Sequence, residues 1–350
     1  MLSLPRRLLV VLTTATVLAV APAVVPVRMA WSAPALRVAE LVAPARPTLP
    51  GPLGRITLPL VPTMEVPFGL SHVGVRWQGD EAASVELRRA PGRGPWAPWR
   101  AVEVAHDLGD EERGEVLSGL LRVDGARRLQ VRGGPTAKQL EVVAIDAVHG
   151  PSHLERAGPA RAGADVAQPS VVPRAQWGAD ESMRRTNPSF APIDRIVVHH
   201  TVTPNGDPDA ASTMRAMHAY HVRGNGWDDI GYNFVIDAAG NVFEGRFARS
   251  YEPGEQPTGE SADGQGAIGA HAEGDNAGSV GVALMGTFTD RTGPTPAALE
   301  SLRRLLAWKA DRHGIDGAGS TAWAGGRVLP TIAGHRDVGS TSCPGDQLWA

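Results

Sequence analysis

Apolar residues in the C-terminal half of the chain follow two different periods. Residues 193–199, with the apolar run 196–198, and the almost continuously apolar residues 279–285 are typical of short strands buried on both faces. Residues 295–313 open with Thr-Pro, repeat leucine at helical spacing and end before a glycine, so they predict a helix. Residues 207–223 predict a second helix. Strands that alternate with helices predict an α/β domain. The sequence changes from a polar, aperiodic segment to this mixed pattern at about residue 171, so we expect the domain to cover residues 171–350.

The preceding segment has the shorter period of a half-buried sheet. Val73, Val75 and Trp77 alternate with other residues, and similar runs separated by turn residues recur as far as residue 148. This pattern predicts a small all-β, sandwich-like domain over 64–149. Residues 36–63 are rich in proline, alanine and leucine and are expected to form an extended lead-in, and the polar, aperiodic residues 150–170 are expected to form a linker.

The first 35 residues have the pattern of a signal peptide. Two arginines precede an apolar run over residues 8–20, and small-residue cleavage sites follow it. The run is shorter than the ~20 residues of a membrane-spanning helix, although an uncleaved anchor is the alternative. We therefore expect residues 1–35 to be removed, and the protein to be secreted or held at the cell wall without a stable membrane anchor.

Composition narrows the classes of partner. The chain of 350 residues suits two domains of ordinary size, with 42% hydrophobic and 20% charged residues. A net charge of −3 gives no electrostatic reason to expect nucleic acid as a partner. We expect a monomer.

The single cysteine, Cys343, is the residue whose chemistry most needs an explanation. One cysteine forms no internal disulfide, so its thiol is a buried filler, a nucleophile, a redox group or a metal ligand. His335 lies eight positions before it, and His199 and His200 end a predicted buried strand. Histidine and cysteine are ligands of zinc, and a catalytic zinc site keeps three protein ligands and one open position. Neighbouring residues on a strand point to opposite faces, so only one of the two adjacent histidines can face such a metal.

Five groups of residues, in order along the chain, resemble the peptidoglycan recognition protein family. That family shares its fold with the type-2 N-acetylmuramoyl-L-alanine amidases, and the resemblance covers about residues 171–350. The segment over 64–148 more loosely resembles the domain found ahead of such amidases in exported actinobacterial proteins. The groups are IVVHHT (196–201), GWDDIGYNF (226–234), GAHA (269–272), SVGVA (279–283) and GHRD (334–337) followed by CPG (343–345).

The resemblance implies a fold and a metal centre. It implies a mixed central β-sheet flanked by helices, with zinc bound by His199, His335 and Cys343. It also implies a catalytic tyrosine at Tyr232 and a polar catalytic position at Thr341, which we expect to donate to the oxyanion. Relatives that only bind the cell wall typically lack the ligand cysteine.

The resemblance further implies a reaction and a substrate. The chain is expected to hydrolyse the amide between N-acetylmuramic acid and L-alanine in peptidoglycan, its expected partner. The Gly226-Trp227 pair indicates a peptide stem with meso-diaminopimelate, whose extra carboxylate suits an arginine such as Arg246. His200 and His271 are the other expected substrate contacts. No glutamate has the spacing usual in metalloproteases, so the general base stays open.

Several alternatives remain at this stage. If the chain does not use zinc for catalysis, it is either a non-catalytic peptidoglycan-binding protein or an enzyme that uses the Cys343 thiol directly. His218 and His221 are three apart on a predicted helix, and we interpret them as part of an amphipathic face. The sequence stops where relatives usually continue with a helix, so we expect that helix to be either truncated or absent.

Overall fold

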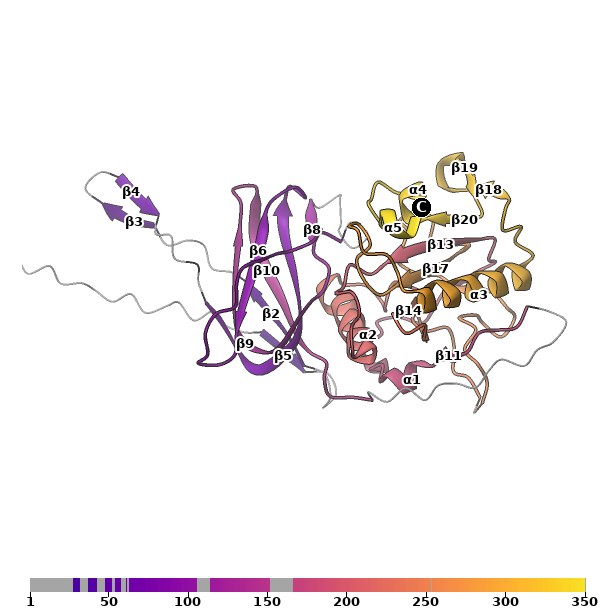
Figure 1. The fold of residues 1–350 in the computed structure, drawn as a ribbon, viewed down its shortest axis with the longest axis horizontal. Coiled ribbons are helices and arrows are strands. Elements are labelled where there is room, and N and C mark those ends of the chain that lie inside the picture. Colours follow the sequence, from indigo (N-terminus) through magenta and orange to yellow (C-terminus); the bar gives the residue numbers. More distant parts are fainter. Residues whose placement is uncertain are drawn as a thin grey trace, which may run out of the picture.

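The computed structural model describes residues 28–31, 37–42, 48–51, 54–57, 61, 63–105, 114–151, 166–252 and 254–349. Most of the expected signal peptide and most of the expected linker lie outside these residues. Figure 1 shows the described chain as two domains side by side, with helix α2 at the boundary between them.

The N-terminal domain is an antiparallel sheet. Its strands follow the order β1-β2-β10-β5-β9-β6-β7, and β8 pairs with β5. Strand β2 pairs with β10 and thus belongs to the sheet, although it lies in the segment expected as a lead-in. The strands are β1 (Arg28–Trp31), β2 (Arg37–Val42), β5 (Met64–Gly79), β6 (Val85–Ala90), β7 (Arg100–Ala101), β8 (Glu115–Leu117), β9 (Leu121–Gly133) and β10 (Ala137–Asp146), with β3 (Thr48–Gly51) and β4 (Gly54–Thr57) forming a separate pair.

Alternation along β5 explains the core of this domain. Val73, Val75 and Trp77 are each fully buried, in one cluster with Leu129 of the neighbouring strand β9 and Leu87 of β6. Because successive side chains of a strand point to opposite faces, this alternation buries one set of side chains within the domain. The sequence prediction of an all-β domain is confirmed.

The C-terminal domain is built on a mixed six-stranded sheet of order β11-β15-β14-β17-β13-β20. Strands β14, β17, β13 and β20 run parallel, and β15 is antiparallel to β14. The bounds are β11 (Val171–Val172), β13 (Arg195–His200), β14 (Phe234–Ile236), β15 (Val242–Glu244), β17 (Ser279–Leu284) and β20 (Ile332–Gly334), with short pairs β12 (Phe190–Ala191) with β16 (Gly266–Ala267) and β18 (Ser320–Ala322) with β19 (Val328–Pro330).

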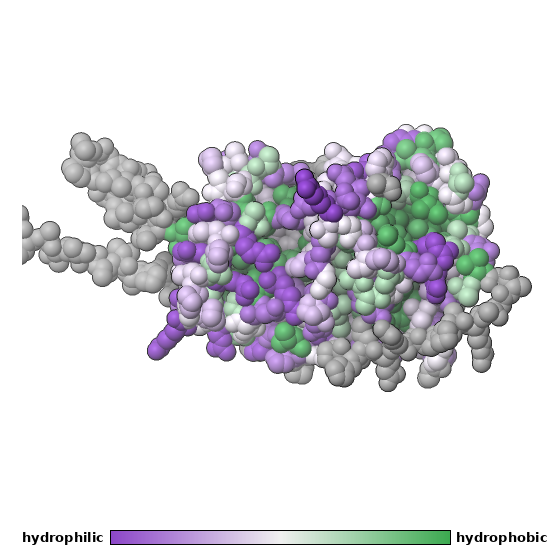
Figure 2. Space-filling view, in the orientation of Figure 1, coloured by the Kyte–Doolittle hydropathy of each residue, from purple (hydrophilic) through white to green (hydrophobic). Residues whose placement is uncertain are grey.

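Helices cover both faces of this sheet, which confirms the predicted fold class. Helix α3 packs on one face, and α2 shares a core with side chains of the other face. Within the described residues, no helix is both long and apolar enough to cross a bilayer. Figure 2 shows that the visible face of the two domains is mostly hydrophilic, with apolar surface gathered over part of the C-terminal domain. The helices are α1 (Arg174–Trp177), α2 (Ala210–Ala219, continued by a π-helical turn Tyr220–Gly224), α3 (Pro296–His313), α4 (His335–Val338) and α5 (Asp346–Trp349).

Helix α3 begins and ends where its sequence signals predict. The Thr295 hydroxyl accepts the N–H of Ala298, and Gly314 ends the helix with a left-handed backbone conformation. Leu302 and Leu305 lie on the buried face, whereas Leu299, which belongs to the same run of leucines at helical spacing, is 42% exposed. Ala298 takes the inward position of this first turn, and one residue further along a helix turns the side chain by about 100°.

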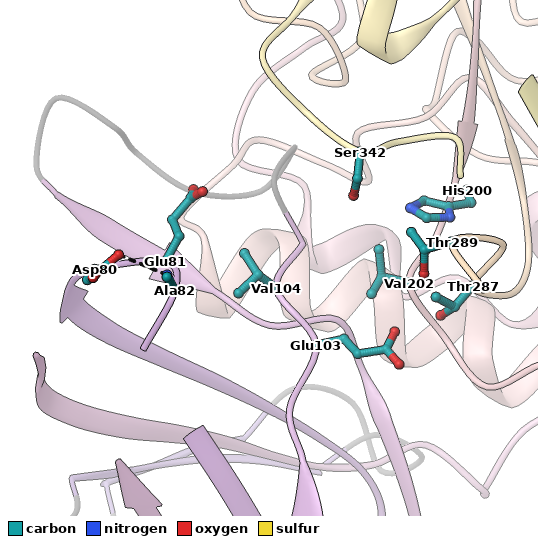
Figure 3. Close-up of a pocket in the computed structure, with 10 residues that line it drawn as sticks. All are labelled: Asp80, Glu81, Ala82, Glu103, Val104, His200, Val202, Thr287, Thr289 and Ser342. Atoms are coloured by element: carbon teal, nitrogen blue, oxygen red, sulfur yellow. Dashed lines mark hydrogen bonds between the residues drawn. The ribbon is translucent and has the colours of Figure 1, made fainter. Parts of the chain in front are cut away.

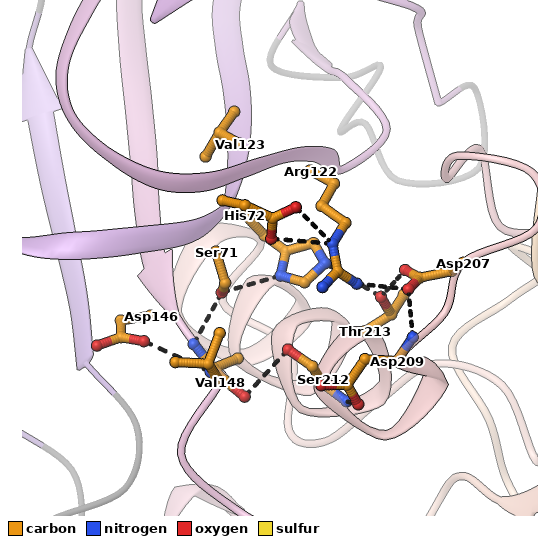
Figure 4. A network of polar contacts seen from close by, with 12 residues as sticks. Ser71, His72, Arg122, Val123, Asp146, Val148, Asp207, Asp209, Ser212 and Thr213 are labelled. Carbon is orange, nitrogen blue, oxygen red and sulfur yellow. Dashed lines mark hydrogen bonds and ion pairs between the residues drawn. The ribbon is translucent and has the colours of Figure 1, made fainter. Parts of the chain in front are cut away.

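The two domains share a continuous apolar interface. Leu117, Leu120 and Ile145 of the β domain lie in one buried cluster with Met214 and Met217 of α2. A polar network borders this cluster, and Figure 4 shows it from close by. In that network His72 Nε2 lies 3.0 Å from the Thr213 hydroxyl, and Arg122 pairs with Asp207. Burial of apolar side chains from both sides makes the two domains one packing unit.

Candidate metal centre

Three side chains from distant parts of the chain meet at the carboxyl ends of two parallel strands. His199 lies near the end of β13, His335 directly follows β20, and Cys343 follows α4. Their ligand atoms all lie within 4.8 Å of one another, and all three side chains are buried. Because β13 and β20 are parallel neighbours, the two histidines emerge at the same edge of the sheet. Two imidazoles and one thiol are a donor set that fits zinc.

The alternation of β13 separates the two adjacent histidines. His199 faces the metal cluster, whereas the ring of His200 lies near Phe288, with 6.2 Å between ring centroids. The His200 Nδ1 accepts the N–H of Phe288 at 3.2 Å. The expectation that only one histidine of the pair points at the metal site is thus met by His199.

Hydrogen bonds beyond the ligands favour one tautomer of His199. The Ser279 hydroxyl donates to the carbonyl of Asp275 at 2.6 Å, so its oxygen accepts from His271 Nε2 at 3.5 Å. With its proton on Nε2, His271 accepts through Nδ1 from His199 Nε2 at 3.1 Å. The lone pair of His199 is then on Nδ1, which lies 3.7 Å from the sulfur of Cys343. This arrangement presents Nδ1 as the ligand atom, as such outer partners do in metal sites.

Burial keeps the imidazoles of this cluster neutral. Desolvation, with the neighbouring His335 and His271, holds the pKa of His199 well below its usual value. Burial and the adjacent His335 also lower the pKa of His271 to about 3. A neutral imidazole is the form that binds metal, so the electrostatics favour ligation.

Cys343 is held by its own loop and by the backbone of β13. The N–H of His200 points to its sulfur at 3.4 Å, a contact that stabilises negative charge on a thiolate. Arg336 ties the loop to α4, because its N–H donates to the Cys343 carbonyl at 2.8 Å and its side chain donates to the Ser342 carbonyl. Arg336 also pairs with Asp346 of α5 at 2.7 Å. The residues around the cysteine therefore set its position before any metal binds.

Tyr232 and Thr341 border the cluster from two sides. The buried Tyr232 ring lies 5.4 Å from the His199 ring, measured between centroids, and 5.7 Å from that of His221. The Thr341 hydroxyl accepts the N–H of Cys343 at 3.0 Å. His221 is a residue whose place here the sequence prediction missed, since helical spacing alone gave no sign that its ring backs the tyrosine.

The remaining expected substrate residues lie around the turn that follows α2. Gly226 has a φ of +78°, a conformation that favours glycine, and its carbonyl accepts from Arg185 at 2.6 Å. The ring of Trp227 stacks near His221, with 4.9 Å between centroids. Arg246 is partly buried, and its guanidinium donates to the Ile230 carbonyl at 3.4 Å. His271, expected to contact substrate, is 2% exposed and instead contacts His199.

A buried charged network supports this turn from below. Asp229 pairs with Arg174 at 3.2 Å and with His218 at 3.0 Å. Burial alone raises the pKa of the Asp229 carboxyl, but the His218 and Arg174 contacts outweigh it and hold that pKa below its usual range. Nearby, burial raises the pKa of the Glu244 carboxyl to about 7, even though it accepts the N–H of Arg174. His218 therefore has a structural role, but it is buried in this network and does not lie on an amphipathic face as predicted.

Comparison with known proteins agrees with this geometry. Residues 189–346 match the N-acetylmuramoyl-L-alanine amidase family called Amidase_2. The human N-acetylmuramoyl-L-alanine amidase is 34% identical over 52% of this chain, and peptidoglycan-recognition protein SC2 of Drosophila simulans is 31% identical over 51% of it. The match covers 83% of the Drosophila protein, but the chain spans only about a quarter of the pig and human amidases, 26% and 27% of their lengths.

Solved structures match the same half of the chain. Peptidoglycan recognition protein-LE, solved in complex with tracheal cytotoxin, a monomeric diaminopimelic acid-type peptidoglycan, is 27% identical. That match covers 51% of this chain and 90% of the solved one, with a TM-score of 0.40.

Proposed function

We propose that this chain, which belongs to the family of peptidoglycan recognition proteins and N-acetylmuramoyl-L-alanine amidases, is a zinc-dependent amidase that cuts peptidoglycan. The bond in question joins N-acetylmuramic acid to L-alanine. The observation that carries the proposal is the buried cluster of His199, His335 and Cys343, whose donor atoms fit zinc. Zinc in proteins usually has four ligands, so a site with three protein ligands is of the catalytic kind. A protein that only binds peptidoglycan has no need of this cluster.

Zinc, when bound by these residues, lowers the pKa of a water ligand towards 7 and polarises a carbonyl oxygen. Hydrolysis adds the hydroxyl of water to the lactyl carbonyl carbon and its proton to the nitrogen of L-alanine as the C–N bond breaks. The protein residues have to orient the carbonyl and to stabilise the negative charge that develops on its oxygen.

Tyr232 and Thr341 are our candidates for that stabilisation. The oxygen of Thr341 already accepts the Cys343 N–H, so its own proton is available to donate to the oxyanion. The Tyr232 ring packs between His199 and His221, which restricts the directions its hydroxyl can take. Burial keeps the pKa of His221 lowered to about 3, so this neighbour stays neutral and adds no charge beside the tyrosine.

The peptide stem is proposed to carry meso-diaminopimelate. Arg246 donates to the carbonyl of Ile230, three residues after Trp227, and this hydrogen bond occupies one donor of a guanidinium that has five. A second carboxylate on the stem residue suits the others. Replacement of Arg246 by alanine is expected to lower kcat/KM for diaminopimelate stems and to leave that for lysine stems unchanged.

We also propose that the protein acts outside the cytoplasm, after removal of residues 1–35. The support is the order of arginines, apolar residues and small residues at the start of the sequence. Amino-terminal sequencing of the mature protein, recovered from culture medium and cell wall, tests this proposal.

The experiment that tests the amidase proposal is digestion of purified diaminopimelate-type peptidoglycan by the full chain supplied with zinc. Mass spectrometry of the soluble products should show peptides with a free amino-terminal L-alanine and glycan with a free lactyl carboxyl group. A protein that sediments with the wall, holds zinc and releases no peptide is instead a binding protein. Inactivation by thiol alkylation with zinc still bound would indicate direct thiol chemistry.

A further inference from the structure

A cavity of about 570 Å³ lies between the two domains, beside the candidate metal centre. Figure 3 shows that Glu103 and Val104 of the β domain face His200, Thr287 and Ser342 of the C-terminal domain across it. Its volume is ordinary for a site that holds a small molecule or one part of a larger ligand.

The cavity lies close to one of the candidate metal ligands. Ser342, which lines the cavity, directly precedes Cys343, and the backbone N–H of His200, which also lines it, lies 3.4 Å from the Cys343 sulfur. The His200 ring points away from the metal cluster, so a ligand in the cavity lies beside the metal centre and not within it.

The wall supplied by the β domain is fixed against the C-terminal domain. A side-chain carbon at Gly119 would lie 2.0 Å from the carbonyl oxygen of Val202, so only glycine permits this approach. Val202, three residues after His199, has a φ of +49°, a left-handed conformation that β-branched residues rarely adopt. Contacts this close, next to the shared apolar cluster, make the cavity a permanent feature of the docked domains.

The cavity continues along the domain boundary. A smaller cavity of about 90 Å³ shares Glu103, Val202 and Thr287 with the larger one and extends to Arg100 and Pro204. Two adjoining cavities that share a wall suit a chain-like ligand better than a compact one.

The lining groups indicate which part of peptidoglycan fits. Among the described residues that line the larger cavity there are carboxylates, threonine and serine hydroxyls and an imidazole, but no lysine or arginine. In the part of the chain that the structure describes, no cation lies within ion-pair distance of Glu103. Carboxylates accept hydrogen bonds from sugar hydroxyls, whereas they repel the carboxylates of a peptide stem.

Resting on the proposed function, we propose that this cavity binds the glycan strand, at a sugar next to the muramoyl unit whose amide is cut. The β domain is then part of the substrate site, with Glu103 as a specificity residue. The peptide stem extends away from the domain boundary.

The test compares two substrates with the same peptide: a single N-acetylmuramoyl peptide and the same peptide on a tetrasaccharide of the wall glycan. Wild-type protein should have a higher kcat/KM for the tetrasaccharide. Glu103→Ala should lower kcat/KM for the tetrasaccharide about tenfold more than kcat/KM for the single-sugar peptide, because one hydrogen-bonding group to the glycan is lost. Glu65→Ala, at an exposed position of β5, is the matched control and should behave as wild type.

Charge reversal and a binding measurement complete the test. Glu103→Lys should lower kcat/KM for the tetrasaccharide substrate further than Glu103→Ala does. If Glu103→Lys instead raises kcat/KM for the single-sugar peptide, the cavity holds the anionic peptide stem and the proposal is wrong. In the Cys343→Ser background, calorimetry with peptide-free glycan oligomer should show binding that Glu103→Ala weakens. Equal preference in all variants overturns the glycan site, whereas wild-type protein that cuts neither substrate overturns the amidase proposal itself.

Discussion

At the scale of single residues, the groups that orient the candidate metal ligands are as important for metal binding as the ligands themselves. His199 has its reactive nitrogen defined by a relay through His271 and Ser279 to a backbone carbonyl. Cys343 has its sulfur met by a backbone N–H. Because these partners are uncharged and buried, they orient the ligands without competing for the metal.

Removal of the relay should weaken the metal site without removing a ligand. We expect His271→Ala to lower zinc affinity about 10- to 100-fold, the usual effect of losing an outer partner of a ligand histidine. Competition with a zinc chelator measures the affinity on protein shown to be folded by circular dichroism. His149→Ala, at an exposed histidine, is the control and should leave the affinity unchanged. Equal affinities for the two variants would refute the relay.

Glu244 gives a prediction about pH. Its pKa is raised by burial to about 7, so the folded protein holds this proton more tightly than the unfolded chain does. The resulting stabilisation is complete below the ordinary glutamate pKa and is lost as the pH rises to about 7.

When the pH is raised from 5 to 8, the wild-type protein should therefore lose up to about 3 kcal/mol of unfolding free energy relative to the Glu244→Gln variant. Urea unfolding at the two pH values measures the difference. If the wild-type and variant proteins show the same change with pH, Glu244 is ionised in the folded protein and this prediction fails.

At the scale of elements, local sequence signals determine where helix α3 begins and ends, whereas packing determines which of its faces is buried. Thr295 and Gly314 determine its ends through local hydrogen bonds and backbone conformation. The face that it buries is decided by the sheet beneath it, which accepts Leu302 and Leu305 and leaves Leu299 largely exposed.

Two leucine substitutions in this helix should thus differ strongly. Leu305→Ala is expected to cost about 2–5 kcal/mol of unfolding free energy, because it leaves a cavity against the sheet. Leu299→Ala should change it by less than about 0.5 kcal/mol, as surface substitutions do. Chemical denaturation of both variants gives the comparison, and equal losses would contradict the assigned buried face.

The docking of the two domains is the main property of the whole molecule. The apolar cluster, the polar network and the contact of Gly119 with Val202 all join the β domain to the segment that follows His199. The β domain is for this reason more than a tether, and in our proposal it forms part of the glycan site.

Gly119→Val should disturb this docking and cost about 1–3 kcal/mol, since the new side chain has to displace backbone. The preference for the longer glycan should fall in parallel. Gly92→Val is the control, because a side chain there meets nothing within 4 Å. Unfolding experiments and the two-substrate assay check both effects; a variant like the control in both would show that the contact is unimportant.

The features that the sequence predicts are those that depend on residues close together along the chain. The ends of α3, the alternation of β5 and the opposite orientations of His199 and His200 depend on near neighbours, so local patterns suffice. The pairing of His199 with His271 joins residues 72 positions apart, and the cavity requires two domains to dock. Neither leaves a local signal, so neither the contact between His199 and His271 nor the cavity at the domain boundary can be predicted from the sequence.

The most direct measurement of the central claim compares wild-type protein with Cys343→Ser in zinc content and in peptide release from diaminopimelate-type peptidoglycan. Serine keeps the size of the side chain but is a much poorer zinc ligand, so the fold should persist. We predict about one zinc per wild-type chain with release of peptides that begin with L-alanine, and loss of both in the variant. Peptide release by the variant at the wild-type rate, without bound zinc, would contradict the account.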